Sequence, residues 1–171
     1  MKEYEKILAG GDLRSIGKSN FVTLKIQTQK DFDELFQYLF HENRIIVMRA
    51  ADAIEKVTIN NAQYLAKHKG EIIKLCNMAK DKELKWHLAL IIPRLHLNNK
   101  EFGNAWNTLV NWAKDKTNSR IVRVNSIQGL FQLKQRDKVF EKEFNLILSE
   151  IINENIPSIN ARIRKLKNKD R

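Results

Sequence analysis

The segment Gly17-Lys18-Ser19 has residue types that could bind a phosphate. The phosphate loop of nucleotide hydrolases needs four residues between its two glycines, so that backbone N–H groups wrap the phosphate. Here five residues separate Gly11 from Gly17, Asp12 stands where the first glycine should be, and no apolar strand pattern precedes the segment. The spacing argues against nucleotide hydrolysis. It leaves open a weaker contact in which Lys18 and helix-start amides meet an anion.

The histidines and the cysteine give little support for metal binding or nucleophilic catalysis. No two histidines have the i, i+4 spacing that lets imidazoles on one helix share a metal ion. Cys76 is the only cysteine, which excludes an internal disulfide, and it lies in an apolar stripe at 72–79, so we expect it buried and inert. There is no Gly-x-Ser-x-Gly segment. We therefore favour a non-catalytic protein without metal or cofactor. The four histidines are His41, His68, His87 and His96.

A repeat determines which polar side chains share a face. Its copies start at Val47, Lys85, Arg123 and Asn160, at intervals of 38, 38 and 37 residues. In the first three copies, small or apolar residues recur at +3, +4, +6 and +7, which is one face of a helix. A second segment with helical periodicity precedes each copy, and a short polar turn joins the two. A fixed period of this size is typical of a solenoid of stacked helix pairs.

The repeat divides the chain into an N-terminal helical cap at 1–28 and helix pairs over 29–168, in a single domain. In the cap we expect helical stretches at 13–16 and 21–27, capped by Asp12 and Ser19. Pro93 lies inside the second repeated helix, expected at 84–97, and predicts a kink near 89–93. The four helix pairs are expected at about 29–65, 66–100, 101–136 and 137–168.

Positions +2, +5 and +9 from each start share one face of the repeated helix, away from the core positions. Those twelve positions carry six Lys or Arg and one His, against one acid. Such a face would form a shallow basic groove that is rich in amides in its third repeat. The candidate binding residues on it are Arg49, Lys56, His87, Arg94, Asn125, Gln128, Gln132, Arg162 and Lys165.

The net charge of +11 is unevenly distributed. Residues 1–85 carry 15 Lys or Arg and 12 Asp or Glu, whereas residues 86–171 carry 16 and 8. Two interpretations stay open: a solvated surface, or a footprint for a polyanion such as nucleic acid, anionic lipid or an acidic protein. No apolar run approaches 18 residues and no secretory signal is visible, so we expect a cytoplasmic protein without membrane insertion.

The paired helices, the 38-residue period and the segment Val122-Arg123-Val124-Asn125-Ser126 resemble HEAT repeats, in the armadillo-like superhelix group, over about 29–168. Segments 10–17, 48–57 and 85–89 also look similar to small bacterial HEAT-like proteins with no assigned activity. The resemblance implies an all-α, right-handed α-α superhelix of about four helix pairs, with the second helix of each pair lining a concave side. Arg123 matches the family's polar ladder and Lys85 is a weaker stand-in, while Val47 and Asn160 depart from it.

Two functions fit these observations. The first is a non-catalytic scaffold whose concave face binds a protein partner through an acidic segment, because solenoids use extended concave surfaces for recognition. The second is binding of nucleic acid, DNA in particular, in the basic groove. Four helix pairs at about 9–10 Å each would span roughly one turn of duplex, and HEAT-like DNA glycosylases offer an analogy at the level of the fold. We expect the scaffold.

Overall fold

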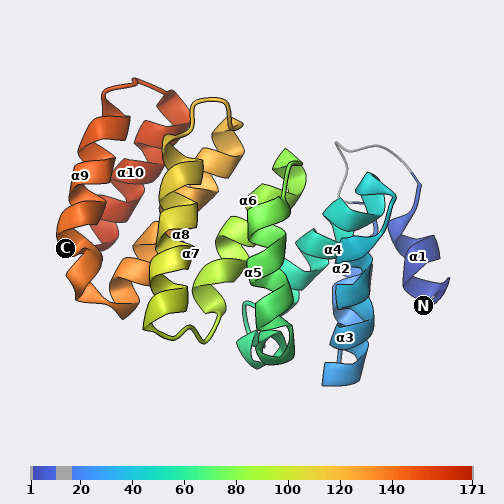
Figure 1. Ribbon diagram of the computed structural model, residues 1–171. Helices are drawn as coiled ribbons and strands as arrows, with labels where there is room; N and C mark the ends of the chain where they lie inside the picture. Colours follow the sequence, from blue (N-terminus) through green and yellow to red (C-terminus); the bar gives the residue numbers. More distant parts are fainter. Residues whose placement is uncertain (1, 11–16, 171) are drawn as a thin grey trace. The chain divides into compact units, whose positions relative to one another are not determined.

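The computed structural model describes residues 2–10 and 17–170, and all regular secondary structure in these ranges is helical (Figure 1). This confirms the all-α prediction for the described residues. They divide into two compact units, Met1–Glu71 (unit 1) and Ile72–Arg171 (unit 2), and the boundary falls inside one helix. The helix expected at 13–16, with its Asp12 cap, lies outside the described residues. The expected repeat boundaries and the single domain stay predictions.

Unit 1 is organised around α4 (Arg44–Val57), which packs against α1 (Lys2–Leu8), α2 (Ser19–Lys25), α3 (Gln29–Gln37) and the short 3-10 helix η1 (Tyr38–Phe40). Ala50, Ala51 and Ala53 of α4 are completely buried, and such small side chains allow neighbouring backbones to approach closely. The Asn43 side chain accepts a hydrogen bond from the Ile45 N–H and so caps the start of α4. The unit also contains the 3-10 helix η2 (Ala62–His68).

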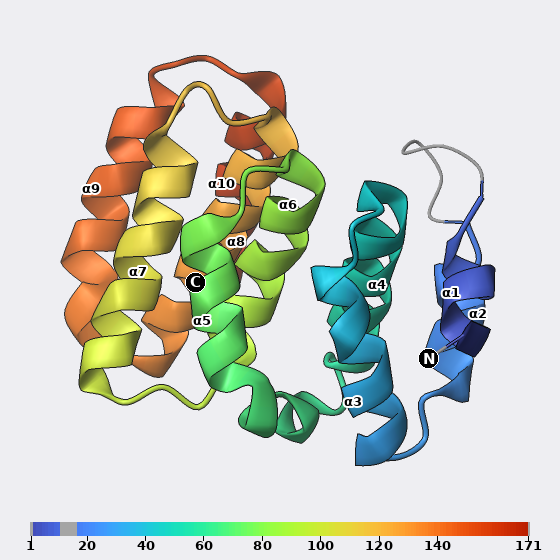
Figure 2. The same ribbon diagram turned by 45° about the vertical axis from the view of Figure 1, so that its right-hand side comes forward.

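Unit 2 is organised around α8 (Arg120–Arg136), which packs against α6 (Lys82–Ile91), α7 (Asn99–Lys114) and α10 (Pro157–Lys169). Figure 2 shows two layers in this unit, α7 and α9 (Glu141–Ile152) in one and α6, α8 and α10 in the other. We call the second of these the B layer. Shorter elements complete the unit: the part of α5 (Lys69–Met78) that follows the boundary, and the 3-10 helices η3 (Ile92–Arg94) and η4 (Lys138–Phe140).

The repeat starts occupy equivalent places in the structure. Val47, Lys85, Arg123 and Asn160 are each the fourth residue of a helix, in α4, α6, α8 and α10. In unit 2 two of them make matching contacts. Lys85 donates to the Asn118 carboxamide oxygen, 3.1 Å away in the turn before α8, and Arg123 donates to Glu154 at 2.8 and 2.9 Å in the turn before α10. In unit 2, two residues one sequence period apart thus contact the turns that precede α8 and α10.

Pro93 ends a helix instead of bending it. The predicted kinked helix at 84–97 is wrong, because α6 stops at Ile91 and tightens into η3. Proline has no N–H to donate to the Ala89 carbonyl four residues earlier. Gly129 of α8 approaches that carbonyl so closely that an added Cβ would lie 2.4 Å from the oxygen. Arg136 then caps the end of this segment by donating to the Pro93 carbonyl at 2.6 Å and the Leu95 carbonyl at 2.9 Å.

Candidate binding surfaces

Arg49, the first candidate binding residue, is used inside unit 1. Its side chain is only 2% exposed, and its guanidinium donates to the carbonyl oxygens of Leu8 at 2.7 Å, Ala9 at 3.2 Å and Gly10. A cation at this place stabilises the carbonyls that the end of α1 leaves without helical partners. Arg49 thus joins α4 to α1. Its outward position in the repeat did not reveal this, because the covering segment lies about forty residues away in the sequence.

Gly17 belongs to the same contact region. Its φ of +54° is in the left-handed region that favours glycine, and an added Cβ would lie 2.6 Å from the Arg49 guanidinium carbon. Gly11 and Asp12, the other half of the loop considered for phosphate, lie outside the described residues. Ser19 does not cap α2 as predicted. The helix begins at this residue, and its buried hydroxyl donates to Asp52 of α4.

Lys56, the second candidate in unit 1, also takes part in a polar network. Its ammonium group donates to Asp52 and to the Asn20 carboxamide oxygen, both at 2.6 Å. Asp52 therefore receives hydrogen bonds from Ser19 on α2 and Lys56 on α4. The network joins these two helices. Lys56 is half-buried, whereas the predicted open groove would leave its side chain solvated.

The other seven candidates belong to unit 2, and five of them form one surface. Asn125, Gln128 and Gln132 recur along one face of α8, and Arg162 and Lys165 lie on the neighbouring helix α10. The Arg162 guanidinium donates to Gln128 at 2.7 Å. The Asn125 side chain donates to the Trp86 carbonyl of α6 at 3.0 Å, so this face of α8 is continuous with both neighbours. We call these five residues the amide–basic surface.

Two candidates stand apart from this surface. His87 of α6 is only 6% exposed, so its side chain is buried and does not face solvent. Its ring lies beside that of Trp86, with 5.6 Å between the ring centroids. Arg94 lies in η3, because α6 ends before it, and is half-buried. The repeat assigned both residues to the outer face of one continuous helix. Because α6 ends at Ile91, Arg94 no longer follows the α-helical register on which that assignment depended.

The positive charge of the chain is concentrated in unit 2. Residues 72–171 carry 20 Lys or Arg and 10 Asp or Glu, whereas residues 1–71 carry 11 and 10. Helix α10 contains five basic residues and no acid. Its buried side chains are Ile159, Ile163 and Leu166, so the basic residues occupy the remaining surface of the helix. The division of charge follows the structural boundary more closely than the midpoint of the chain.

Two other basic residues of unit 2 have partners inside it. Arg123 is only 2% exposed and donates a hydrogen bond to the Ala113 carbonyl at 2.7 Å. Two nitrogens of its guanidinium also donate to the Glu154 carboxylate. The side-chain hydrogen bond from Arg123 lowers the pKa of Glu154, and it outweighs the opposing effect of burial. Lys134 is fully buried and pairs with Glu141 at 3.4 Å and with Asp170. These two cations stabilise the fold.

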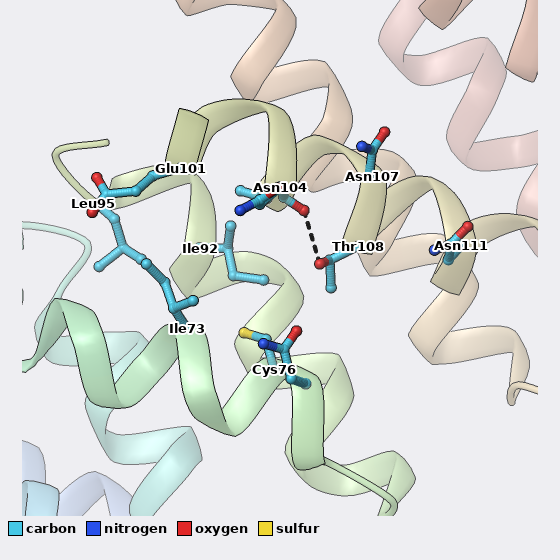
Figure 3. Close-up of a pocket in the computed structure, with 11 residues that line it drawn as sticks. Ile73, Cys76, Ile92, Leu95, Glu101, Asn104, Asn107, Thr108 and Asn111 are labelled. Carbon is cyan, nitrogen blue, oxygen red and sulfur yellow. Dashed lines mark hydrogen bonds between the residues drawn. The ribbon is translucent and has the colours of Figure 1, made fainter. Parts of the chain in front are cut away.

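A groove opens between α5, η3 and α7, within unit 2 (Figure 3). It encloses about 360 Å³. Cys76 in its wall is buried, as the sequence predicted, and burial raises the pKa of its thiol to about 12. No local sequence pattern predicts the groove, because it depends on the spacing of α5, η3 and α7 in the folded chain. The apolar lining consists of Ile73, Cys76, Ile92, Leu95 and Ala105, and the polar lining of Asn77, Glu101, Asn104, Asn107, Thr108 and Asn111.

His68 is buried, and its contacts with Phe36 and with two carboxylates lie within unit 1. It stacks on Phe36 with 3.9 Å between ring centroids, and its two nitrogens lie 2.8 Å from Asp33 and 3.1 Å from Glu71. Burial raises the pKa of Asp33, but hydrogen bonds from Gln29, His68 and Lys67 outweigh it and lower that pKa. Among the residues described, no group of three or more His, Cys, Asp or Glu is placed to hold a metal ion. The cluster ties α3 to η2.

Comparison with other proteins adds no assignment. A scan against protein-family models finds no match, and searches of curated proteins and of solved structures find no similar protein. Within 2–10 and 17–170, no helix has both the length and the apolar character needed to cross a bilayer.

Proposed function

We propose that the protein is a non-catalytic binding scaffold, a superhelix of HEAT-like helix pairs whose unit 2 binds an acidic segment of a protein partner. The matching contacts of Lys85 and Arg123 support the superhelix, because equivalent residues one period apart reach equivalent turns. Helix pairs that stack in this way present an extended surface made of their second helices. In unit 2 that surface is the B layer of α6, α8 and α10.

The amide–basic surface is the observation that carries the proposal. Side-chain amides offer both donors and acceptors, and can pair with the polar backbone of a bound segment. Arg162 and Lys165 beside them supply positive charge for carboxylates, and charge-assisted hydrogen bonds of this kind are stronger than neutral ones. The existing contact from Arg162 to Gln128 shows that α8 and α10 are close enough to act on one ligand.

Affinity capture with charge-reversed variants tests this proposal. The variant is Arg162→Glu with Lys165→Glu, and the control is Lys142→Glu, which reverses an exposed charge on α9 in the other layer. We expect wild-type protein and the control to capture the same partner from cell extract, and the double variant to lose it. The circular dichroism spectra and melting temperatures of all three should agree. Capture of the same proteins by all three would contradict the proposal.

Nucleic acid is the second candidate, favoured by the charge of unit 2 and by the five basic residues of α10. A stretch of cations without acids binds phosphates largely regardless of base sequence and releases counterions on binding. Affinity for duplex DNA should then fall steeply as salt rises, about tenfold or more between 50 and 200 mM for several phosphate contacts. Anisotropy titrations with DNA, RNA and heparin at several salt concentrations would measure this. Absence of binding at low salt would exclude it.

A further inference from the structure

Helix α2 carries two apolar side chains on its outer face. The helix packs against α4 and α1, and its Ser19 and Val22 side chains are completely buried there (Figure 2). Phe21 and Leu24 lie on the side away from these buried residues, and they are 51% and 73% exposed. Residues three apart in a helix are neighbours on its surface. Phe21 and Leu24 therefore form one exposed apolar patch.

The charge beside this patch is positive. Residues 17–30 carry three lysines and no Asp or Glu. The Lys25 ammonium group lies 5.3 Å from the centre of the Phe21 ring. Lys18 is exposed and directly precedes the first residue of α2. We call Lys18, Phe21, Leu24 and Lys25 the α2 surface.

A hollow of about 330 Å³ adjoins the start of α2 and shares Lys18 with the α2 surface. Its described lining contains two more cations, Lys6 of α1 and Arg49 of α4, and no acid. Arg49 is buried and bonded to carbonyls at the end of α1, so the exposed side chains of Lys6 and Lys18 supply the charge that an anion can reach. Unit 1 thus carries positive charge beside its exposed apolar patch.

An anionic lipid surface fits this combination of groups. Anionic headgroups attract lysines, and apolar side chains that project from a helix enter the boundary between headgroups and acyl chains. A fluid boundary receives projecting side chains without a preformed cavity, whereas a protein partner must offer packing shaped to both Phe21 and Leu24. No helix within 2–10 and 17–170 can cross a bilayer, so the contact of these residues with lipid is peripheral.

We propose that the α2 surface binds the surface of a membrane that contains anionic lipids. Phe21 and Leu24 enter the boundary region, and Lys18 and Lys25 extend their ammonium groups toward the headgroups. The α2 surface belongs to unit 1, so this binding does not depend on the acidic partner proposed for unit 2.

Co-sedimentation with lipid vesicles tests this proposal. The whole chain is titrated with vesicles of phosphatidylcholine, either alone or mixed with about one third phosphatidylserine. The test variant is Phe21→Gln with Leu24→Gln. The matched control is Val139→Gln with Leu146→Gln, which replaces two exposed apolar side chains of unit 2. All four side chains are exposed, so both variants should fold, and circular dichroism spectra and melting temperatures verify this.

We expect wild-type protein and the control to bind the anionic vesicles, and to bind pure phosphatidylcholine at least about tenfold more weakly. Phe21→Gln with Leu24→Gln should weaken binding to the anionic vesicles about tenfold or more, because it removes both apolar side chains from the boundary region. Lys18→Gln with Lys25→Gln should also weaken it about tenfold or more, because each lysine near an anionic surface contributes about fivefold.

Three results would overturn this proposal. The first is that wild-type protein does not bind the anionic vesicles; self-association or capture of a soluble protein that needs Phe21 and Leu24 would then assign the patch to a protein interface. The second is vesicle binding that Phe21→Gln with Leu24→Gln leaves unchanged, and loss of that binding with Arg162→Glu and Lys165→Glu would place it on unit 2.

The third result is that soluble glycerophosphoserine binds as tightly as the vesicles do, which would assign the lysines to a free anion and not to a lipid surface. Failure of the acidic-partner proposal would leave the vesicle binding of wild-type protein intact, because the two proposals use different units. The two outcomes can therefore be told apart.

Discussion

Arg123 is a buried cation at a repeated position, and its described contacts stabilise the fold. It lies at a repeat start, and its partners are the Ala113 carbonyl and the Glu154 carboxylate. Arg49 and Lys134 are likewise buried and paired within their units. Basic residues on a helical face therefore divide into internal ones, which hold neighbouring elements, and exposed ones such as Lys165.

The pair of Arg123 and Glu154 should make stability depend on pH. The folded state lowers the pKa of Glu154 from 4.5, so its contribution is complete above about pH 4.5 and is lost as pH falls through the lower folded value. We expect Glu154→Gln to cost about 1–3 kcal/mol at pH 7. Urea unfolding should show this difference shrinking below about pH 4.5. A difference that stayed constant down to pH 3 would contradict it, and Glu143→Gln on the exposed face of α9 serves as control.

Cys76 offers a second test at the same scale. Because burial raises its pKa to about 12, almost no thiolate exists near pH 8 in the folded protein. A thiol-disulfide reagent such as Ellman's reagent should therefore react more than about 100-fold more slowly with native protein than with protein unfolded in urea. Equal rates in the two states would show that the thiol is accessible.

At the scale of elements, Gly129 permits the close approach of α6 and α8. An added Cβ would lie 2.4 Å from the Ala89 carbonyl oxygen and 3.0 Å from Leu109. Gly129→Ala should therefore destabilise the protein by about 1–3 kcal/mol, despite the better helix propensity of alanine. Gly103→Ala in α7 is the matched control, because nothing lies within 4 Å of its added Cβ, and it should stabilise by about 0.5–1 kcal/mol. Unfolding midpoints in urea measure both, and similar stabilisation by the two variants would contradict the packing argument.

The helices themselves were accessible to sequence reasoning, because their apolar periodicity and capping residues are local signals. Asn98 caps α7 close to residue 101, where the third helix pair was expected to begin, and Ser119 caps α8. The end of α6 was not accessible in the same way. A proline inside an apolar pattern either kinks a helix or ends it. Here Pro93 follows the end of α6, and Gly129 of α8 lies close to the Ala89 carbonyl oxygen.

The candidate site was predicted less completely than the helices. The amides of α8 and the cations of α10 share a surface, as the repeat positions suggest, because both follow local periodicity. The burial of Arg49 depends on the segment around Leu8, and no periodic signal in α4 reports such a distant contact. The groove was not predicted from the sequence, because it depends on the distance between α5 and α7, which tertiary packing determines. The polar row of Asn104, Thr108 and Asn111 on α7 was its only local trace.

At the scale of the whole molecule, charge is the property that most limits the partner. Unit 2 has twice as many basic as acidic residues, whereas unit 1 is nearly balanced. Long-range attraction to a polyanion should therefore come mainly from unit 2 and should weaken with salt. An acidic protein segment and a nucleic acid both satisfy this requirement. In the proposed function, the amides of α8 pair with the polypeptide backbone of the acidic segment.

The most direct test is an anisotropy titration of a labelled acidic peptide, about twenty residues long with Glu at every second position, against wild-type protein. Its analogue with Gln in place of Glu and a duplex DNA of similar charge are the comparison ligands. We expect saturable binding of the acidic peptide, weakened at least about tenfold by Arg162→Glu with Lys165→Glu and less than about twofold by Lys142→Glu. Equal affinity of all three proteins for the acidic peptide, or binding of the DNA alone, would contradict the proposed function.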